Sequence, residues 1–392
     1  MQFKSDIYKK IVLIVFLAGI FCEYFVSFSG TLIGGYKEPI IIVAGMGLFC
    51  LTSALAYDYK SILTKKGIIE LLVYLAIIGY SLICFKYQHT ALILRISLIL
   101  ISSKLLLERI NYDVVRCVLK LFFSGTGIVL LAFAILSAFG VYGSFSITQN
   151  FRHTPETRYC FGFFHPNGFS MFYLKFILLG LYLYADRMKL GLLLVLSFVL
   201  SFPLFLSDSK MVLICYLFAY VLSIITKFLK GKDVSKLLLI ISAFIVCVIL
   251  GLVVTTAFID EGSITIGNPQ NLWDYFNDIT SGRLYSMSKS FHSYDISLFG
   301  YGNTIVTTEN GYVNAMFSEG LIFVCIFFIS CVWLLYRMYK SKNNIGIIVV
   351  TAALMSLFSE SFMAYFNKNI VWVIMMGYIG NRSDSVEKSS MS

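Results

Sequence analysis

Four cations could bind a phosphate on the outer side of this chain. They are Arg152, Arg158, Lys210 and Arg283, which lie in polar segments between predicted apolar helices, on the side where basic residues are uncommon. They therefore oppose the positive-inside rule and call for another role. The planar guanidinium of arginine can donate two parallel hydrogen bonds to a phosphate, which favours anion recognition. Contact with lipid headgroups is the second interpretation of these cations.

A broken helix end is predicted beside Arg158. Residues 158–168 read Arg-Tyr-Cys-Phe-Gly-Phe-Phe-His-Pro-Asn-Gly, so a proline and glycines stand at the outer start of a predicted span. Such an end leaves backbone N–H groups available for an anion. His165 could act as an acid or a base, or it could simply begin the helix. Asn167 lies two residues further on.

A carboxylate stands just before a later predicted span. Glu309 is followed by Asn310, Gly311 and Tyr312. Glu309 could accept a proton as a general base. A carboxylate at a helix N-terminus is also a plain helix cap, so both interpretations stay open.

Ionisable residues inside apolar segments need a reason, because each costs about 2.5–3.5 kcal/mol near the bilayer centre. Glu23, Arg95, Glu319 and Glu360 all lie in the outer halves of predicted spans. Together they suggest a water-filled cavity that opens outward. For Arg95 alone, snorkelling to the interface is the alternative. Lys175 is placed near the middle of a span.

The elements that position these residues are membrane helices. The chain has 392 residues, of which 58% are apolar and 13% charged, and it contains five prolines. This composition predicts an all-α polytopic membrane protein. About twelve apolar runs of spanning length are present. They cover residues 11–29, 39–57, 68–85, 91–107, 118–139, 161–184, 190–206, 211–227, 237–259, 313–335, 345–362 and 365–381.

The basic residues set the orientation. About twenty of them fall in alternate loops against about eight in the others, which predicts that both termini are cytoplasmic. The net charge of +10 thus reflects topology and gives no reason to expect nucleic acid. Nine cysteines are present, most of them in apolar runs, and no metal-binding spacing is visible. We expect neither a metal nor a cofactor.

Two outer segments are longer than the other loops. The first covers residues 141–160. The second covers residues 260–312, and within it Leu284, Met287 and Phe291 follow helical spacing behind Thr280 and Ser281 as caps. A short amphipathic helix at the membrane surface is predicted there. The chain thus divides into helices over 1–259, an extracellular recognition or catalytic loop over 260–312, and helices with a cytoplasmic tail over 313–392.

Four segments together resemble the O-antigen polymerase and ligase superfamily, in particular the Wzy-type polymerases of capsule and exopolysaccharide pathways. Residues 162–168 are similar to the family's Gly-Phe-x-His-Pro-Asn stretch, and residues 207–210 stand at its Ser-Arg turn. Residues 281–283 with 299–302 are similar to its Gly-Arg and Gly-x-Gly pair. Residues 309–312 with Gly320 are similar to its His-Asn-x-Tyr…Gly run. The order of the segments and the topology agree over most of the chain.

Two departures from the family pattern matter. Lys210 replaces the usual arginine, and Glu309 stands where many ligases have histidine. The second departure favours a polymerase over a ligase, and it leaves the identity of any base open.

The resemblance implies a metal-independent glycosyltransferase of the GT-C type in the bacterial cell membrane. The donor would be a glycan on undecaprenyl pyrophosphate, and the acceptor a repeat unit on the same lipid. Glu309 would be catalytic, and Arg283, Lys210 and Arg158 would bind pyrophosphate. The substrate-binding set would be His165, Asn167, Asn310, Tyr312 and Arg95. Expected partners are membrane lipid, a chain-length regulator and a flippase.

Three other functions stay open. One is a structural or partner-binding membrane protein, which would leave the outward cations unexplained. A ligase of the same superfamily would transfer the glycan to a different acceptor. A lipid-linked oligosaccharide flippase or another transporter would more often show an internal repeat, and none is visible here.

Overall fold

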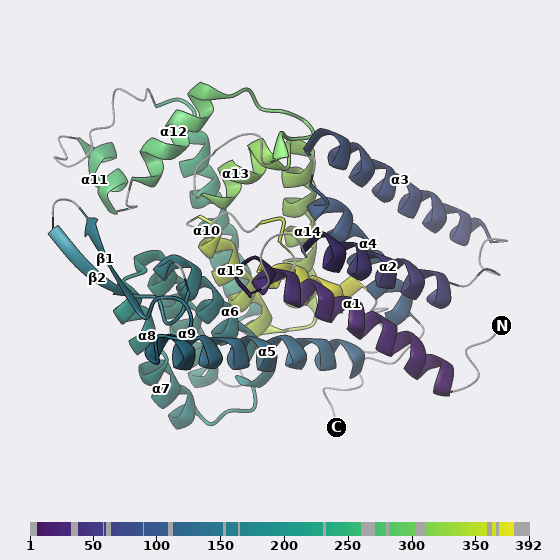
Figure 1. Cartoon of the computed structure of the whole chain (residues 1–392), viewed down its shortest axis with the longest axis horizontal. Coiled ribbons are helices and arrows are strands. Elements are labelled where there is room, and N and C mark those ends of the chain that lie inside the picture. The colour runs from purple at the N-terminus through teal and green to yellow at the C-terminus, as the bar shows by residue number, and fades with distance from the viewer. Residues whose placement is uncertain are drawn as a thin grey trace. The chain divides into compact units, whose positions relative to one another are not determined.

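A computed structural model describes residues 6–32, 38–57, 59, 64–88, 90–108, 113–151, 154–163, 165–229, 233–259, 271–279, 282–302, 310–358, 363–365 and 368–379. Helices dominate this part of the chain, with one two-stranded hairpin (Figure 1). In chain order the elements are α1 (Asp6–Leu32), α2 (Glu38–Ala56), α3 (Lys65–Gln88), α4 (Leu92–Leu107), α5 (Asp113–Ala138), β1 (Ser146–Phe151), β2 (Thr154–Tyr159), α6 (Pro166–Tyr184), α7 (Leu190–Val199), α8 (Phe202–Ser207), α9 (Lys210–Phe228), α10 (Ser235–Thr256), α11 (Leu272–Ile279), α12 (Arg283–Ser293), α13 (Gly311–Ser318), α14 (Leu321–Lys340), α15 (Asn344–Ser356) and α16 (Ile370–Ile379).

Seven helical stretches of the described chain are long and apolar enough to cross a membrane, judged by length and composition. They are Pro39–Ala56, Lys65–Gln88, Arg116–Ala138, Leu190–Ser207, Lys210–Phe228, Ser235–Thr256 and Leu321–Lys340. The chain is therefore an all-α polytopic membrane protein, as predicted. The other predicted spans fall on α1, α4, α6, α15 and α16, so a total of twelve stays a prediction.

Two predicted spans are interrupted helices. The span predicted at 190–206 consists of α7 and α8, with Pro203 in the first turn of α8. Proline has no N–H to continue the ladder, which explains the break. The span predicted at 313–335 begins as the short α13 and restarts as α14 after Gly320, whose φ is 92°. Glu319 thus lies at a helix junction.

Contacts between elements divide the chain into two compact units. Unit 1 comprises Met1–Leu119, Leu298–Ile305 and Ala364–Ser392, and unit 2 comprises Lys120–Ser297 and Val306–Met363. These units differ from the linear division at residues 259 and 312, which follows predicted topology. The boundary near residue 119 falls inside α5.

Unit 2 is built around α15. This helix contacts α6, α9, α10 and α14, and every residue from Ile345 to Ser356 is buried. Two polar contacts tie it to α10. Ser235 Oγ donates to Asn344 Oδ1 at 2.7 Å, and the hydroxyls of Ser242 and Thr351 lie 2.6 Å apart. From the first pair to the second, the chain advances seven residues along α10 and seven residues along α15, so the two helices run parallel. Small hydroxyl side chains of this kind allow close helix packing in membranes.

In unit 1 the segment after α12 packs on the end of α3. Gln88 Nε2 donates to the Phe299 carbonyl at 2.5 Å, and the Phe299 ring stacks on Tyr87 with centroids 5.6 Å apart. Gly302 has φ 61°, and a Cβ there would lie 2.0 Å from the Gln88 carbonyl oxygen. Only glycine fits this close approach. The Gly-x-Gly stretch thus has a packing role.

Candidate functional site

Arg158 is the centre of the best-connected polar cluster on the predicted outer side. It lies in β2 opposite Ile147 and is buried. Its Nε donates to the Ser207 carbonyl, and its Nη2 donates to the Asp208 carbonyl and to Asn167 Oδ1, each at 3.0 Å. A cation against the last carbonyls of α8 is favourable because that helix end carries partial negative charge. Arg158 therefore joins the hairpin, the start of α6 and the α8–α9 turn.

The start of α6 is a capped helix end. His165 is exposed, and its Nδ1 accepts a hydrogen bond from the Asn167 backbone N–H at 3.2 Å, with Pro166 in the first helical position. The Oγ atoms of Ser170 and Ser207 lie 2.7 Å apart and tie α6 to α8. His165 thus performs the structural role that was one of its two interpretations.

The turn before α6 depends on a glycine. Gly162 has φ 87°, and a Cβ there would lie 2.4 Å from the Phe133 carbonyl oxygen. Phe161, the residue before it, also has a positive φ of 47°. This tight turn carries the chain from β2 into the first turn of α6, and so it sets where Asn167 meets Arg158.

Lys210 is the first residue of α9 and is exposed. Its N-cap residue, Ser209, makes no side-chain capping bond, and Asp208 before it is left-handed with φ 48°. The first backbone N–H groups of a helix carry partial positive charge. Lys210 therefore adds a full positive charge at the start of α9. Arg158 holds the Asp208 carbonyl, two residues before Lys210. Arg158, Asn167 and the turn into Lys210 form one connected set.

Arg283 begins the predicted surface helix, which is α12. Its N-cap is Gly282, with φ 83°, while Thr280 and Ser281, the predicted caps, lie outside the described residues. Asn277 of α11 positions this start: its carbonyl accepts from Gly282 N–H at 2.8 Å and its Oδ1 accepts from Tyr285 N–H at 3.0 Å. The buried face of α12 includes the predicted Leu284 and Met287. Arg283 is thus held on a separate element from Arg158.

Asn310 and Tyr312 are buried and bond the end of α15. Asn310 Oδ1 caps α13 by accepting from the N–H groups of Tyr312 and Val313, both at 3.0 Å. Its Nδ2 donates to the Phe358 carbonyl at 2.8 Å, and Tyr312 Oη donates to the Leu354 carbonyl at 2.6 Å. The Phe358 carbonyl lies beyond the last residue of α15, and the Leu354 carbonyl also accepts from the Leu357 N–H in the last turn. In this structure both side chains serve as anchors of α13.

Glu309, the predicted base, lies outside the described residues, as does Glu360. What the structure does show is the anchor directly after Glu309. The Gly311 N–H donates to the Leu357 carbonyl at 2.7 Å, next to the Asn310 bond to Phe358. The chain is therefore held firmly one residue after the predicted base.

Arg95 forms a buried ion pair within unit 1. Its Nε lies 2.7 Å from Glu23 Oε1 and its Nη2 lies 2.6 Å from Oε2, so the pairing between α4 and α1 is bidentate. The side chains are 8% and 2% exposed, so neither charge faces bulk water. Two of the four residues that suggested an outward cavity thus neutralise each other, as membrane charges commonly do.

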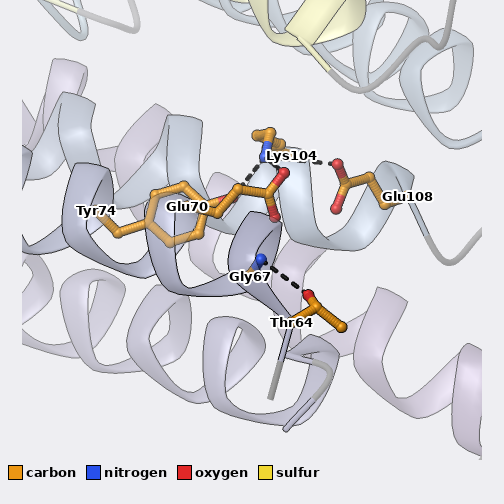
Figure 2. A network of polar contacts seen from close by, with 6 residues as sticks. All are labelled: Thr64, Gly67, Glu70, Tyr74, Lys104 and Glu108. Atoms are coloured by element: carbon orange, nitrogen blue, oxygen red, sulfur yellow. Dashed lines mark hydrogen bonds and ion pairs between the residues drawn. The ribbon is translucent and has the colours of Figure 1, made fainter. Parts of the chain in front are cut away.

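A second polar cluster joins α3 to α4 in unit 1 (Figure 2). Lys104 Nζ donates to Tyr74 Oη at 2.7 Å and lies 3.4 Å from a Glu70 oxygen and 3.5 Å from a Glu108 oxygen. Thr64 Oγ1 caps the start of α3 by accepting from Gly67 N–H at 3.1 Å. Each charge in this cluster has an opposite partner, so it is explained by helix packing at the ends of α3 and α4.

Sequence reasoning missed the groups that hold the predicted cations. The carbonyls of Ser207 and Asp208, the Asn277 side chain and the Glu23–Arg95 pairing were not predicted. For the last, two isolated opposite charges in apolar helices were a usable signal. Among the described residues, no three His, Cys, Asp or Glu side chains are placed to hold a metal ion. Comparison with protein-family models, curated proteins and solved structures finds no match.

Proposed function

We propose that this protein polymerises lipid-linked oligosaccharide repeat units into capsular polysaccharide or exopolysaccharide. The transfer would take place on the outer face of the cytoplasmic membrane, from a glycan on undecaprenyl pyrophosphate. The observation that carries the proposal is the Arg158 cluster, which joins the first turn of α6 to the turn that begins α9. Two helix N-termini and two cations in one connected set favour an anion of high charge.

The division of labour between the cations follows from their contacts. The Nε and Nη2 atoms of Arg158 donate to protein acceptors. Among the described residues, no acceptor is bonded to its Nη1. Lys210 is exposed at the start of α9. Arg158 would therefore shape the pyrophosphate site and donate from Nη1, while Lys210 would supply a mobile point charge. Arg283 would contribute from α12.

The reaction is a displacement at the anomeric carbon of the donor glycan. The acceptor hydroxyl oxygen forms the new bond, the bond from the anomeric carbon to the pyrophosphate oxygen breaks, and undecaprenyl pyrophosphate leaves with the electron pair. Cations that face the leaving group stabilise the charge as it develops. Glu309 would accept the hydroxyl proton. Asn310 and Tyr312 support this role by anchoring the chain directly after Glu309.

The proposed topology has twelve spans with both termini in the cytoplasm. The parallel arrangement of α10 and α15 supports it, because two spans that start on the same side must run the same way. Lys236 at the start of α10 and Lys342 just before α15 are placed where the positive-inside rule puts basic residues.

Lipid-linked glycans from cells that lack the protein test the function. A polymerase defect should leave single repeat units on the outer face and little long polymer. A flippase defect would trap the repeat units on the inner face, and a ligase defect would leave long glycan on its lipid carrier. Either of these last two outcomes would refute the polymerase proposal.

Replacing Glu309 tests the base. Glu309→Gln keeps the size of the side chain but removes the charge. Because Asn310 caps α13, this helix should remain in place while transfer falls by about 10² or more. Polymer length and protein level in the membrane are the measurements. Normal polymer length at normal protein level would exclude Glu309 as the base.

A further inference from the structure

One face of α14 is exposed, while the opposite face packs against α10, α13 and α15. The exposed face carries Ile329, Trp333 and Tyr336, whose exposed fractions are 70%, 37% and 51%, and it ends at the exposed Lys340. Arg337 lies beside them and is half-buried. Spacings of three and four residues place all five on one side of the helix. The α14 face is defined as these five residues.

The type of side chain changes in order along the α14 face. Ile329 comes first, the Trp333 and Tyr336 rings follow, and the two cations stand in the last turn. The helix is long and apolar enough to cross a membrane, and it ends at Lys340. Tryptophan and tyrosine are enriched where the hydrocarbon layer meets the headgroups. We therefore expect the rings to lie at that boundary and the helix end to lie among the headgroups.

Both cations of the α14 face are folded back onto its rings. The Arg337 Cζ lies 5.9 Å from the centroid of the Trp333 ring, and the Lys340 Nζ lies 5.5 Å from that of Tyr336. Each ring comes one turn earlier in the helix, so the cations point toward the hydrocarbon layer. A snorkelling cation would extend the other way, into water. Cation–π contacts thus hold the two charges at the level of the rings.

Charges held at this depth need an anion. Within the described part of the chain, no carboxylate forms an ion pair with Lys340. Lys342, in contrast, pairs with Asp233 at 3.3 Å. The phosphates of membrane lipids are the anions available at the level of the rings.

We propose that the α14 face binds the headgroup of an anionic phospholipid in the leaflet that borders the end of this helix. Under the proposed topology this is the cytoplasmic leaflet. Two cations beside one phosphate favour a lipid of net negative charge, because a zwitterionic headgroup brings its own cation to the site. An acidic protein in water fits less well, since the cations are turned toward the hydrocarbon layer. This lipid site would be present whatever reaction the protein catalyses.

Quenching of Trp333 fluorescence by brominated lipids tests the site. The full-length protein is placed in phosphatidylcholine vesicles that contain increasing fractions of brominated phosphatidylglycerol or, separately, of brominated phosphatidylcholine. The chain has three tryptophans, so the quenching that is lost in Trp333→Phe defines the share of Trp333. We expect brominated phosphatidylglycerol to reach half-maximal quenching at a mole fraction about tenfold lower than brominated phosphatidylcholine. The double variant Arg337→Gln with Lys340→Gln should lose most of this preference.

The matched control removes the same amount of charge elsewhere. Lys189 caps the start of α7 and Lys236 is the second residue of α10, and both are exposed on the same predicted side. Lys189→Gln with Lys236→Gln should keep the preference for phosphatidylglycerol. An equal loss in this control would overturn the proposal, because the charge of the whole surface would then attract the lipid.

The comparison of the two lipids on the wild-type protein decides even if a variant does not fold. Half-maximal quenching at equal fractions of the two brominated lipids would overturn the lipid site. An acidic protein would then be the better occupant of the α14 face. Neither outcome would bear on the proposed polymerase function, since no residue of the α14 face takes part in it.

Discussion

At the scale of single residues, the predicted site residues divide into two groups. Asn310 and Tyr312 are buried and bonded to the end of α15. They would therefore influence a reaction only indirectly, by fixing the position of neighbouring residues. His165 and Lys210 are exposed at the starts of α6 and α9, where they can meet a ligand directly. Arg158 belongs to both groups, because it is buried and bonds three protein acceptors yet lies between these two helix starts.

Replacement of Arg158 by lysine should be poorly tolerated. Lysine keeps the charge but cannot bond the Ser207 and Asp208 carbonyls and Asn167 together, because it lacks the planar fork. We expect Arg158→Lys to lower thermal stability and to remove most long polymer. Lys210→Arg is the matched exchange in the opposite direction and should retain polymer, since Lys210 is exposed. Equal polymer in the two variants would contradict the role of the fork.

The role of His165 can be separated into capping and acid–base chemistry. Asparagine is a good N-cap but does not titrate, so His165→Asn should keep α6 capped. His165→Ala should cost about 1 kcal/mol of stability. If capping is the whole role, polymer should be near normal in His165→Asn and reduced in His165→Ala. Loss of polymer in both variants, with normal stability of His165→Asn, would show that the imidazole itself is needed.

At the scale of elements, polar contacts at helix ends decide how the helices meet. The Glu23–Arg95 pair joins α1 to α4, the Lys104 cluster joins α3 to α4, and Asn310 with Tyr312 joins α13 to α15. Each set satisfies groups that lipid cannot solvate. Apolar packing surrounds these contacts, so the pairing of helices depends on a few polar residues.

The Glu23–Arg95 pair should behave as a unit. Arg95→Met removes one partner and leaves a buried carboxylate, which should cost about 3–5 kcal/mol of stability. Adding Glu23→Leu to Arg95→Met should restore much of the loss, because both charges are then absent. Thermal unfolding in detergent measures both variants. A double variant as unstable as the single one would show that Arg95 stabilises the protein through contacts other than the pair with Glu23.

At the scale of the whole molecule, the orientation in the membrane is the prediction that matters most. The basic residues predict that residues 260–312 face outward. A membrane-impermeant thiol reagent should therefore label Ser263→Cys in intact cells. Ser341→Cys, just after α14, should be labelled only after lysis. The reverse pattern would invert the topology and place the Arg158 cluster on the cytoplasmic side.

The sequence alone was sufficient to predict the membrane class and most helices. Length and hydropathy are local properties, so the seven spanning stretches coincide with predicted spans. The amphipathic α12 was likewise visible in the spacing of Leu284 and Met287. The interruptions after α7 and α13 were not predicted. A single residue such as Pro203 or Gly320 hardly changes the mean hydropathy of a span.

Only the tertiary structure decided which distant groups meet. Arg158 and Ser207 are 49 residues apart in the chain, Asn310 and Phe358 are 48 apart, and Glu23 and Arg95 are 72 apart. The type of each residue showed that it needed a partner, but packing of whole helices selected the partner. Hydropathy determines that a segment is a membrane helix, while the side chains that meet across helices determine its neighbours. For that reason the cations could be named from the sequence, and the carbonyls that hold Arg158 could not.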